Sequence, residues 1–215
     1  IRKKNPNFIN LCLNESLSSE ITLQPIQRFD LDAAIIFSDI LMLPYGLGQK
    51  VEFIKNFGPR LGELNINDID KINDIDFVQK LEPVYKAIKR VSSDPILNNK
   101  NTIGFVGAPW TLLVYMINQQ SPKRELKKNF FKDETYINKI LLIIEKFLKV
   151  HIKNQIDSGA NVIQIFDSWA GLLEEKYLLN YIYAPTLNLV NYVKSLNKPV
   201  ICFPREIKNY KEFCE

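Results

Sequence analysis

The chain has 215 residues, of which 46% are hydrophobic and 24% charged, enough for one large globular domain or two small ones. This composition excludes a disordered or fibrous chain, and no apolar run approaches the roughly 20 residues that cross a bilayer. The net charge of +4 comes from interspersed Lys and Glu, so charge alone gives no argument for nucleic acid. Three scattered cysteines provide neither a disulfide framework nor the paired spacing of a zinc site, which favours a reducing compartment.

The N-terminal region predicts helical structure followed by a strand. Residues 1–19 are polar and read as a loop or a weak helix, while residues 20–29 carry apolar residues at near-helical spacing, with a kink or restart at Pro25. Ala33 to Phe37 is a short, continuous apolar run that ends at Ser38-Asp39, which is typical of a strand buried on both faces. The chain begins at Ile1 rather than Met, and we expect it to be a piece of a longer protein.

The rest of the chain alternates between apolar runs and helical patterns. Residues 51–59 predict a hairpin or ordered loop, and residues 65–76 predict helical turns. Further helices are expected over residues 77–91, 111–118, 123–153 and 172–196, the last with a break at Pro185, and further strands over 102–106, 161–166 and 199–203.

This order of elements indicates parallel strands joined by crossover helices. Four such strands fit half of a (βα)8 barrel of the TIM-barrel type better than a finished open sheet, although a doubly wound α/β fold is the alternative. We expect a single partial domain over 1–215, with a leading helical segment at 1–31 and the first four βα units at 32–215.

Polar residues collect where the strands end. In either architecture the carboxyl ends of the strands carry the functional loops, and these ends supply Asp39, Gly107 to Trp110, Asp167-Ser168 and Arg205. A carboxylate at Asp39 would lie at the top of a hydrophobic wall, where it must find hydrogen-bond donors, and the simpler alternative is a turn cap. Ser168 is equally typical of a helix N-cap.

Other motifs of catalysis are weak. His151 is the only histidine and lies between Val150 and Ile152 on a long helix, which favours a packed or surface histidine and leaves a histidine-based triad unsupported. Tyr115, two turns into its helix, is by spacing alone more typical of an interior residue. Neither a G-x-G-x-x-G motif nor a P-loop occurs, so nucleotide cofactors lose support.

Three ordered stretches resemble the uroporphyrinogen decarboxylase family of haem biosynthesis. The first runs from Thr22-Leu23-Gln24-Pro25 to Leu41, and the second from Ile103 to Met116. The third comprises Gly159-Ala160 and Ile165 to Gly171. The resemblance covers about residues 21–203 in register, nearly the whole chain.

The resemblance implies a (βα)8 barrel, a homodimer, and a carboxy-lyase that works without metal or organic cofactor. Its substrate is the cyclic tetrapyrrole uroporphyrinogen III, whose four acetate side chains become methyl groups to give coproporphyrinogen III. By the resemblance, the catalytic aspartate corresponds to Asp39 and the substrate-binding hydroxyls to Tyr115 and Ser168. The residues that line the pocket are Ile35, Phe37, Phe105 and Phe166.

Some family features lie outside this chain. The family's arginine-rich loop precedes the position of Ile1, its C-terminal histidine motif follows that of Glu215, and Ile207-Lys208 replaces a glycine-rich turn near Arg205. The alternatives are a corrinoid-dependent methyltransferase of the same superfamily, whose zinc ligands are His and Cys, and an inert tetrapyrrole-binding remnant. The abundance of Asn, Ile and Lys suggests an AT-rich coding sequence, and we expect a cytoplasmic or plastid protein.

Overall fold

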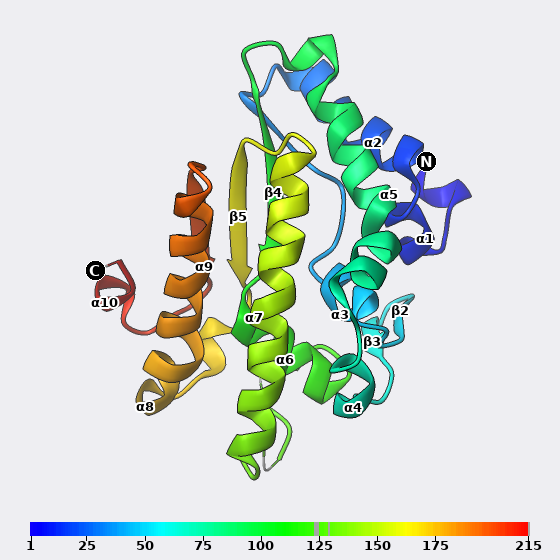
Figure 1. The fold of residues 1–215 in the computed structure, drawn as a ribbon. Coiled ribbons are helices and arrows are strands. Elements are labelled where there is room, and N and C mark those ends of the chain that lie inside the picture. The colour runs from blue at the N-terminus through cyan, green and yellow to red at the C-terminus, as the bar shows by residue number, and fades with distance from the viewer. Residues whose placement is uncertain (123–124, 129, 215) are drawn as a thin grey trace.

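The computed structural model describes residues 1–122, 125–128 and 130–214, which contain a four-stranded parallel sheet (Figure 1). The strand order β1-β4-β5-β6 is also the order of these strands along the chain. A doubly wound sheet reverses its order at a switch point, and the described strands show no reversal. The sheet is therefore an arc of the (βα)8 type, as the sequence predicts. Its strands are β1 (Ala33–Ile35), β4 (Asn101–Gly107), β5 (Val162–Asp167) and β6 (Val200–Pro204).

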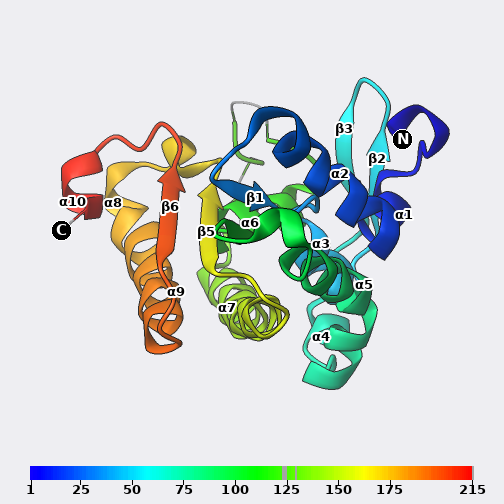
Figure 2. The same cartoon turned by 90° about the horizontal axis from the view of Figure 1, so that it is seen from above.

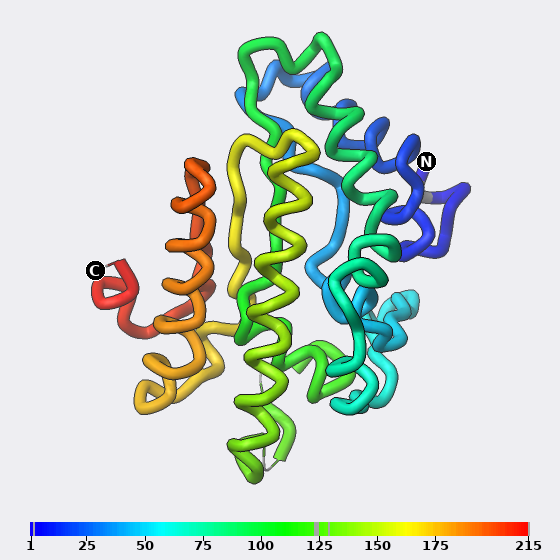
Figure 3. Tube along the Cα trace, viewed as in Figure 1, coloured from blue at the N-terminus to red at the C-terminus, as the bar shows by residue number. Residues whose placement is uncertain are grey.

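Long helices cover one face of this sheet. Helices α5, α7 and α9 lie side by side along it, as Figure 2 shows, and α2 packs against α5 and β1. The longer helices are α2 (Glu15–Phe29), α5 (Asp74–Ser92), α6 (Pro109–Asn118), α7 (Glu134–Asp157) and α9 (Ala184–Ser195). The short helices are α1 (Phe8–Cys12), α3 (Met42–Gly46), α4 (Ile66–Ile69), α8 (Glu175–Leu178) and α10 (Tyr210–Cys214). The two ends of the chain lie on opposite sides of the molecule (Figure 3).

The remaining elements are small. An antiparallel hairpin, β2 (Val51–Ile54) with β3 (Gly58–Leu61), confirms the hairpin expected between residues 51 and 59. A π-helical turn, η4 (Leu179–Tyr183), separates α8 from α9, whose first turn holds Pro185, so the break expected there is confirmed. Within the described residues, the 3-10 turns are η1 (Arg2–Lys4), η2 (Pro95–Leu97) and η3 (Ala170–Leu172).

The prediction that β1 is buried on both faces is wrong. Ala34 and Ile36 are buried against the helices, whereas Ile35 between them is 50% exposed. The same alternation runs along β5 and β6, where Ile201 and Phe203 are exposed. A strand's successive side chains point to opposite faces, and no described element covers the second face of this sheet. Ile35 is a predicted pocket residue, whereas the sequence alone did not place Ile201 and Phe203 on this open face.

The start of helix α7 also differs from expectation. The helix expected from residue 123 begins at Glu134, because Asp133 caps it by accepting a hydrogen bond from the Tyr136 amide at 2.9 Å. Lys123 lies outside the described residues, and Phe130 and Phe131 before the cap pack on Trp110 instead.

The loop or weak helix expected over residues 1–19 contains α1 and the start of α2. Asn14 caps α2, accepting from the Leu17 amide at 3.0 Å. Helix α2 then continues through Pro25, so the kink or restart expected there does not divide it.

Candidate active site

The carboxyl ends of the four parallel strands lie at one edge of the sheet. Asp39 follows β1, Gly107 ends β4, Ser168 follows β5 and Arg205 follows β6. Because neighbouring parallel strands end together, this edge gathers the polar residues that the sequence places after each strand.

An aromatic surface lies on the face of the sheet that the helices leave open. The predicted pocket residues Ile35, Phe37, Phe105 and Phe166 all line one groove of about 480 Å³ that also reaches α2. The Phe105 and Phe166 rings meet edge to face, with centroids 5.5 Å apart. The structure thus brings the four predicted lining residues together along one groove.

Sequence reasoning missed Phe203 as a member of this aromatic surface. Phe203 pairs in register with Phe166 across β5 and β6, their ring centroids lie 6.5 Å apart, and Phe203 is 52% exposed. The available signal was its place in an alternating strand, because Ile201 and Phe203 share one face.

Asp39 is half-buried and held by its own turn. Its Oδ1 accepts a hydrogen bond from the Leu41 amide at 2.8 Å, so the capping role is present. No described residue donates to its Oδ2. Burial raises the pKa of the Asp39 carboxyl to about 6, partly offset by the Leu41 hydrogen bond. At neutral pH the group is therefore mostly a carboxylate, with one oxygen available to a ligand.

Tyr115 lies close enough to Asp39 for the Asp39 charge to shift the pKa of the Tyr115 hydroxyl. Burial raises the pKa of the Tyr115 hydroxyl, and the negative charge of Asp39 raises it further. Tyr115 also packs on Trp169, with ring centroids 5.9 Å apart. Sequence reasoning did not single out Trp169, whose buried indole N–H lies near the Tyr115 hydroxyl and partly offsets the rise in its pKa.

Ser168 lies on a turn that a buried network holds. Asp167, directly before it, is buried on the helix side of β5 and accepts a hydrogen bond from the Thr111 hydroxyl at 2.6 Å. The Trp169 amide donates to the same hydroxyl at 3.1 Å, and the Trp110 indole N–H donates to the Trp169 carbonyl at 2.9 Å. Burial raises the pKa of Asp167 to about 7. Among the described residues, Ser168 and Asp39 share no hydrogen bond.

The remaining candidates take simpler roles. His151 is a buried, packed histidine whose Nδ1 lies 3.0 Å from the Tyr85 hydroxyl, and burial lowers its pKa to about 4. Arg205 is exposed and pairs with Glu206 at 3.2 Å. Within residues 1–122, 125–128 and 130–214, no group of three His, Cys, Asp or Glu side chains is arranged to hold a metal ion. None of the helices described is long and apolar enough to cross a membrane.

A larger cavity lies elsewhere. It measures about 630 Å³ and is lined by residues of α1, β2, the segment before β2 and Lys80. None of the predicted site residues lines it, so volume alone does not locate the candidate site.

Comparisons with known proteins agree with the three sequence motifs. The family model described as uroporphyrinogen decarboxylase matches residues 1–213. The uroporphyrinogen decarboxylase of Campylobacter jejuni is 39% identical over 216 residues, which cover 98% of this chain and 63% of that protein. The enzyme of Rickettsia bellii is 38% identical over 209 residues, 95% of this chain and 61% of that protein. The chain thus spans less than two thirds of the length of these relatives.

A solved structure supports the fold. A methyltransferase from Methanosarcina mazei superposes with a TM-score of 0.69 at 18% identity, covering 88% of this chain and 56% of that chain. At this identity the likeness shows a shared fold and does not favour the methyltransferase alternative. The match of the family model over nearly all residues, together with the two relatives, confirms the resemblance seen in the sequence, and the chain belongs to the uroporphyrinogen decarboxylase family.

Proposed function

We propose that this chain is part of a uroporphyrinogen decarboxylase, a carboxy-lyase of haem biosynthesis. The substrate would be uroporphyrinogen III, whose four acetate side chains lose their carboxyl groups stepwise to give coproporphyrinogen III. The observation that carries the proposal is the family match together with Asp39, which stands beside Tyr115 at the strand edge, next to the aromatic groove.

The chemistry needs a place for the electrons that carbon dioxide leaves behind. Protonation of a pyrrole carbon makes the ring a cation, and the ring then accepts the electron pair of the breaking carbon–carbon bond as carbon dioxide departs. A proton delivered to the remaining methylene carbon completes the methyl group, and loss of the first proton from the ring carbon then restores the pyrrole. A negative group held beside the ring lowers the barrier by stabilising the cation, most strongly where water is excluded.

Asp39 suits this role in our proposal. Its free Oδ2 can accept hydrogen bonds from the pyrrole N–H groups, which converge at the centre of the macrocycle. Its negative charge is opposite in sign to that of the protonated ring and stabilises it. Tyr115 and Ser168 would donate hydrogen bonds to the substrate, and Ile35, Phe37, Phe105 and Phe166 would pack on its faces.

The wider setting follows from the family. We propose that residues 1–31 form a leading segment and residues 32–215 the first βα units of a barrel that works as a homodimer, in the cytoplasm or a plastid. The proposed reaction needs no cofactor, because the substrate's own pyrrole accepts the electrons.

The test uses the protein extended to the length of its relatives. Purified protein is incubated anaerobically with uroporphyrinogen III, and the products are oxidised to porphyrins and separated by chromatography. We expect products that have lost between one and four carboxyl groups. A folded protein that binds uroporphyrinogen without releasing carbon dioxide would support the inert remnant, and methyl transfer to a corrinoid would support the methyltransferase.

A further inference from the structure

The ladder between β1 and β4 stops shortly before Asp39. Its last hydrogen bond runs from the Ile36 amide to the Ile103 carbonyl at 3.1 Å. Backbone groups of successive strand residues point to opposite sides, so the Phe37 amide and carbonyl point away from β4. β1 has no described strand on that side, and buried backbone groups need partners.

The β4 strand stops bonding to β1 at the same level, after Ile103. The Phe105 amide and carbonyl would continue the ladder toward β1, but both bond to the Gln155 side chain of α7, at 2.9 and 3.0 Å. Gln155 can approach the Phe105 backbone because residue 104 is a glycine. A Cβ at Gly104 would lie 2.5 Å from Gln155 Oε1. The end of β1 is therefore not held by β4.

Helix α2 holds the end of β1 instead. The Ser18 hydroxyl donates to the Phe37 carbonyl at 2.6 Å, and the Phe37 amide donates to Thr22 Oγ1 at 2.8 Å. The Thr22 hydroxyl in turn donates to the Ser18 carbonyl at 2.8 Å, which uses its single proton. Both side chains are buried, and we call them the α2 hydroxyl pair.

Asp39 is only two residues beyond this attachment. On its other side, its own carboxylate accepts from the Leu41 amide, and its carbonyl accepts from the Met42 amide at 3.2 Å. The segment that carries Asp39 is thus held at both ends, upstream by α2 and downstream by its turn into α3. Movement of the Phe37 peptide would pass directly to the Asp39 carboxylate.

We propose that Ser18 and Thr22 are positioning residues, whose hydroxyls set the place of Asp39 through the Phe37 peptide. This inference rests on the proposed function, because it assigns a catalytic consequence to the place of Asp39. Ser18 does not line the groove, and Thr22, which does, is only 4% exposed and has its hydroxyl engaged with the backbone. An error of about 1 Å in the position of a catalytic group can cost up to roughly a hundredfold in rate. A displaced Phe37 peptide could therefore lower the rate without any change at Asp39 itself.

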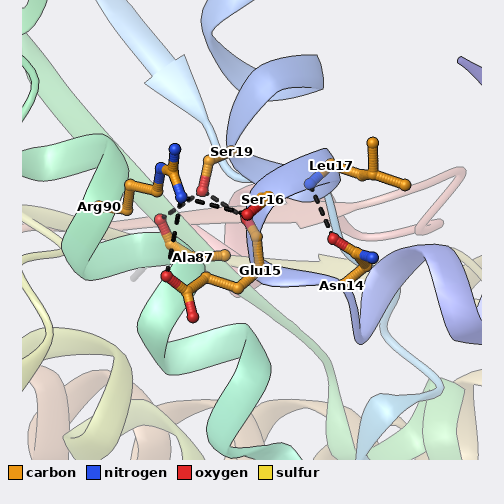
Figure 4. Close-up of polar contacts among 7 residues, drawn as sticks. All are labelled: Asn14, Glu15, Ser16, Leu17, Ser19, Ala87 and Arg90. Atoms are coloured by element: carbon orange, nitrogen blue, oxygen red, sulfur yellow. Dashed lines mark hydrogen bonds and ion pairs between the residues drawn. The ribbon is translucent and has the colours of Figure 1, made fainter.

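A matched control lies next to the pair. Ser19 is as buried as Ser18, with 1% of each exposed, and lies on the same turn of α2. Its hydroxyl donates its one proton to the Glu15 carbonyl at 2.6 Å, and the Ala87 carbonyl of α5 is a second acceptor at 3.3 Å, so it does not bond to β1. Figure 4 shows Ser19 facing Ala87 beside the contacts of Arg90 with Glu15 and Ser16. Loss of either serine hydroxyl removes a buried hydrogen bond from the same helix, but only Ser18 reaches Phe37.

The experiment compares Ser18→Ala, Ser19→Ala, Thr22→Val and Thr22→Ser in the protein extended to the length of its relatives. Thermal melts are recorded beside steady-state kinetics. We expect Ser18→Ala and Ser19→Ala to lower Tm similarly. We expect kcat to fall about tenfold in Ser18→Ala and Thr22→Val, with KM changed less than about threefold, because the displaced carboxylate acts on the charged transition state. Thr22→Ser keeps the hydroxyl and should restore kcat.

A second measurement does not depend on activity. Amide hydrogen exchange at Phe37 should be faster in Thr22→Val than in Ser19→Ala, since only the former removes its acceptor. Equal exchange, or kcat values equal to that of Ser19→Ala, would overturn the inference. If Asp39→Asn loses turnover while the variants of the α2 hydroxyl pair do not, only this inference fails. If Asp39→Asn also keeps turnover, the proposed role of Asp39 fails with it.

Discussion

Asp39 Oδ1 caps its own turn by accepting from the Leu41 amide, whereas Oδ2 has no described donor and is available to the substrate. A single substitution can therefore separate the capping role from the proposed catalytic role. In the extended protein, Asp39→Asn keeps an acceptor for the Leu41 amide and nearly the same volume, and we expect the melting temperature to change little. The negative charge is lost, and we expect turnover to fall by roughly a hundred- to thousandfold, about 3–4 kcal/mol of transition-state stabilisation. Substrate binding should weaken too, because an amide NH2 faces pyrrole N–H donors.

The matched control for this change is Asp39→Ala, which removes the cap as well as the charge. If Asp39 only caps its turn, Asp39→Ala should lower Tm by a few degrees while Asp39→Asn keeps normal turnover. Near-normal steady-state turnover of a folded Asp39→Asn protein would remove Asp39 from the mechanism.

The Tyr115 hydroxyl should matter less than the Asp39 charge. Tyr115→Phe keeps the ring that packs on Trp169 and removes one hydrogen-bond donor. We expect a loss of about 1–3 kcal/mol in kcat/KM, the cost of one hydrogen bond left unmade. Kinetics and a thermal melt of the extended protein check this together. Full activity with unchanged stability would show that the hydroxyl does not contact the substrate.

The packing of helix α5 against helix α7 buries His151, and this burial makes the free energy of unfolding depend on pH. His151 of α7 is buried beside Tyr85 and Phe77 of α5, and burial lowers its pKa from 6.5 to about 4. The unfolded chain therefore binds a proton between these values and the folded chain does not. The contribution of neutral, buried His151 to the free energy of unfolding is complete above pH 6.5 and declines as pH falls toward 4.

We expect His151→Gln, which can still accept from the Tyr85 hydroxyl, to remove this dependence. Relative to the variant, the wild-type chain should lose about 2 kcal/mol of unfolding free energy between pH 7.5 and pH 5. Asp39 and Asp167 have raised pKa values and act in the opposite direction, so the difference between the two proteins isolates His151. Denaturant titrations at both pH values provide the measurement. An equal pH dependence in both proteins would contradict the assignment.

The sequence predicts the strands and their order well because each strand is a short apolar run between turn residues. It also predicts the polar edge of the sheet, since Asp39 lies four residues after the end of β1 and Ser168 directly follows β5. It fails where tertiary contacts decide the outcome. Exposure of Ile35 depends on what covers the second face, and the start of α7 depends on the packing of Phe130 against Trp110.

The contacts that hold the site also escape sequence reasoning. Ser18 reaches Phe37 across 19 residues, and Gln155 reaches Phe105 across 50, and no periodic pattern records either contact. Polar side chains on a helix face read as ordinary surface or capping residues until the strand beside them is placed.

For the whole molecule, we expect this chain by itself not to decarboxylate uroporphyrinogen. Its length is 61–63% of that of the relatives above, and β1 and β6 form the two edges of the described sheet. Unpaired parallel edges and an exposed apolar face, with Ile201 and Phe203 on it, favour association. Product analysis beside size-exclusion chromatography tests this, and turnover by a monomer comparable to that of the extended protein would contradict it.

The chain-order arrangement of β1, β4, β5 and β6 also bears on synthesis at the ribosome. Each strand pairs only with strands that are its neighbours in the parallel series, so every new strand meets a finished edge when it leaves the exit tunnel. No strand must wait for a later one to be inserted between it and its partner. Since chains emerge N-terminus first at about 5–20 residues per second, the sheet can grow by addition at a single edge. Nascent chains arrested after β5 should therefore already protect the backbone amides of β4.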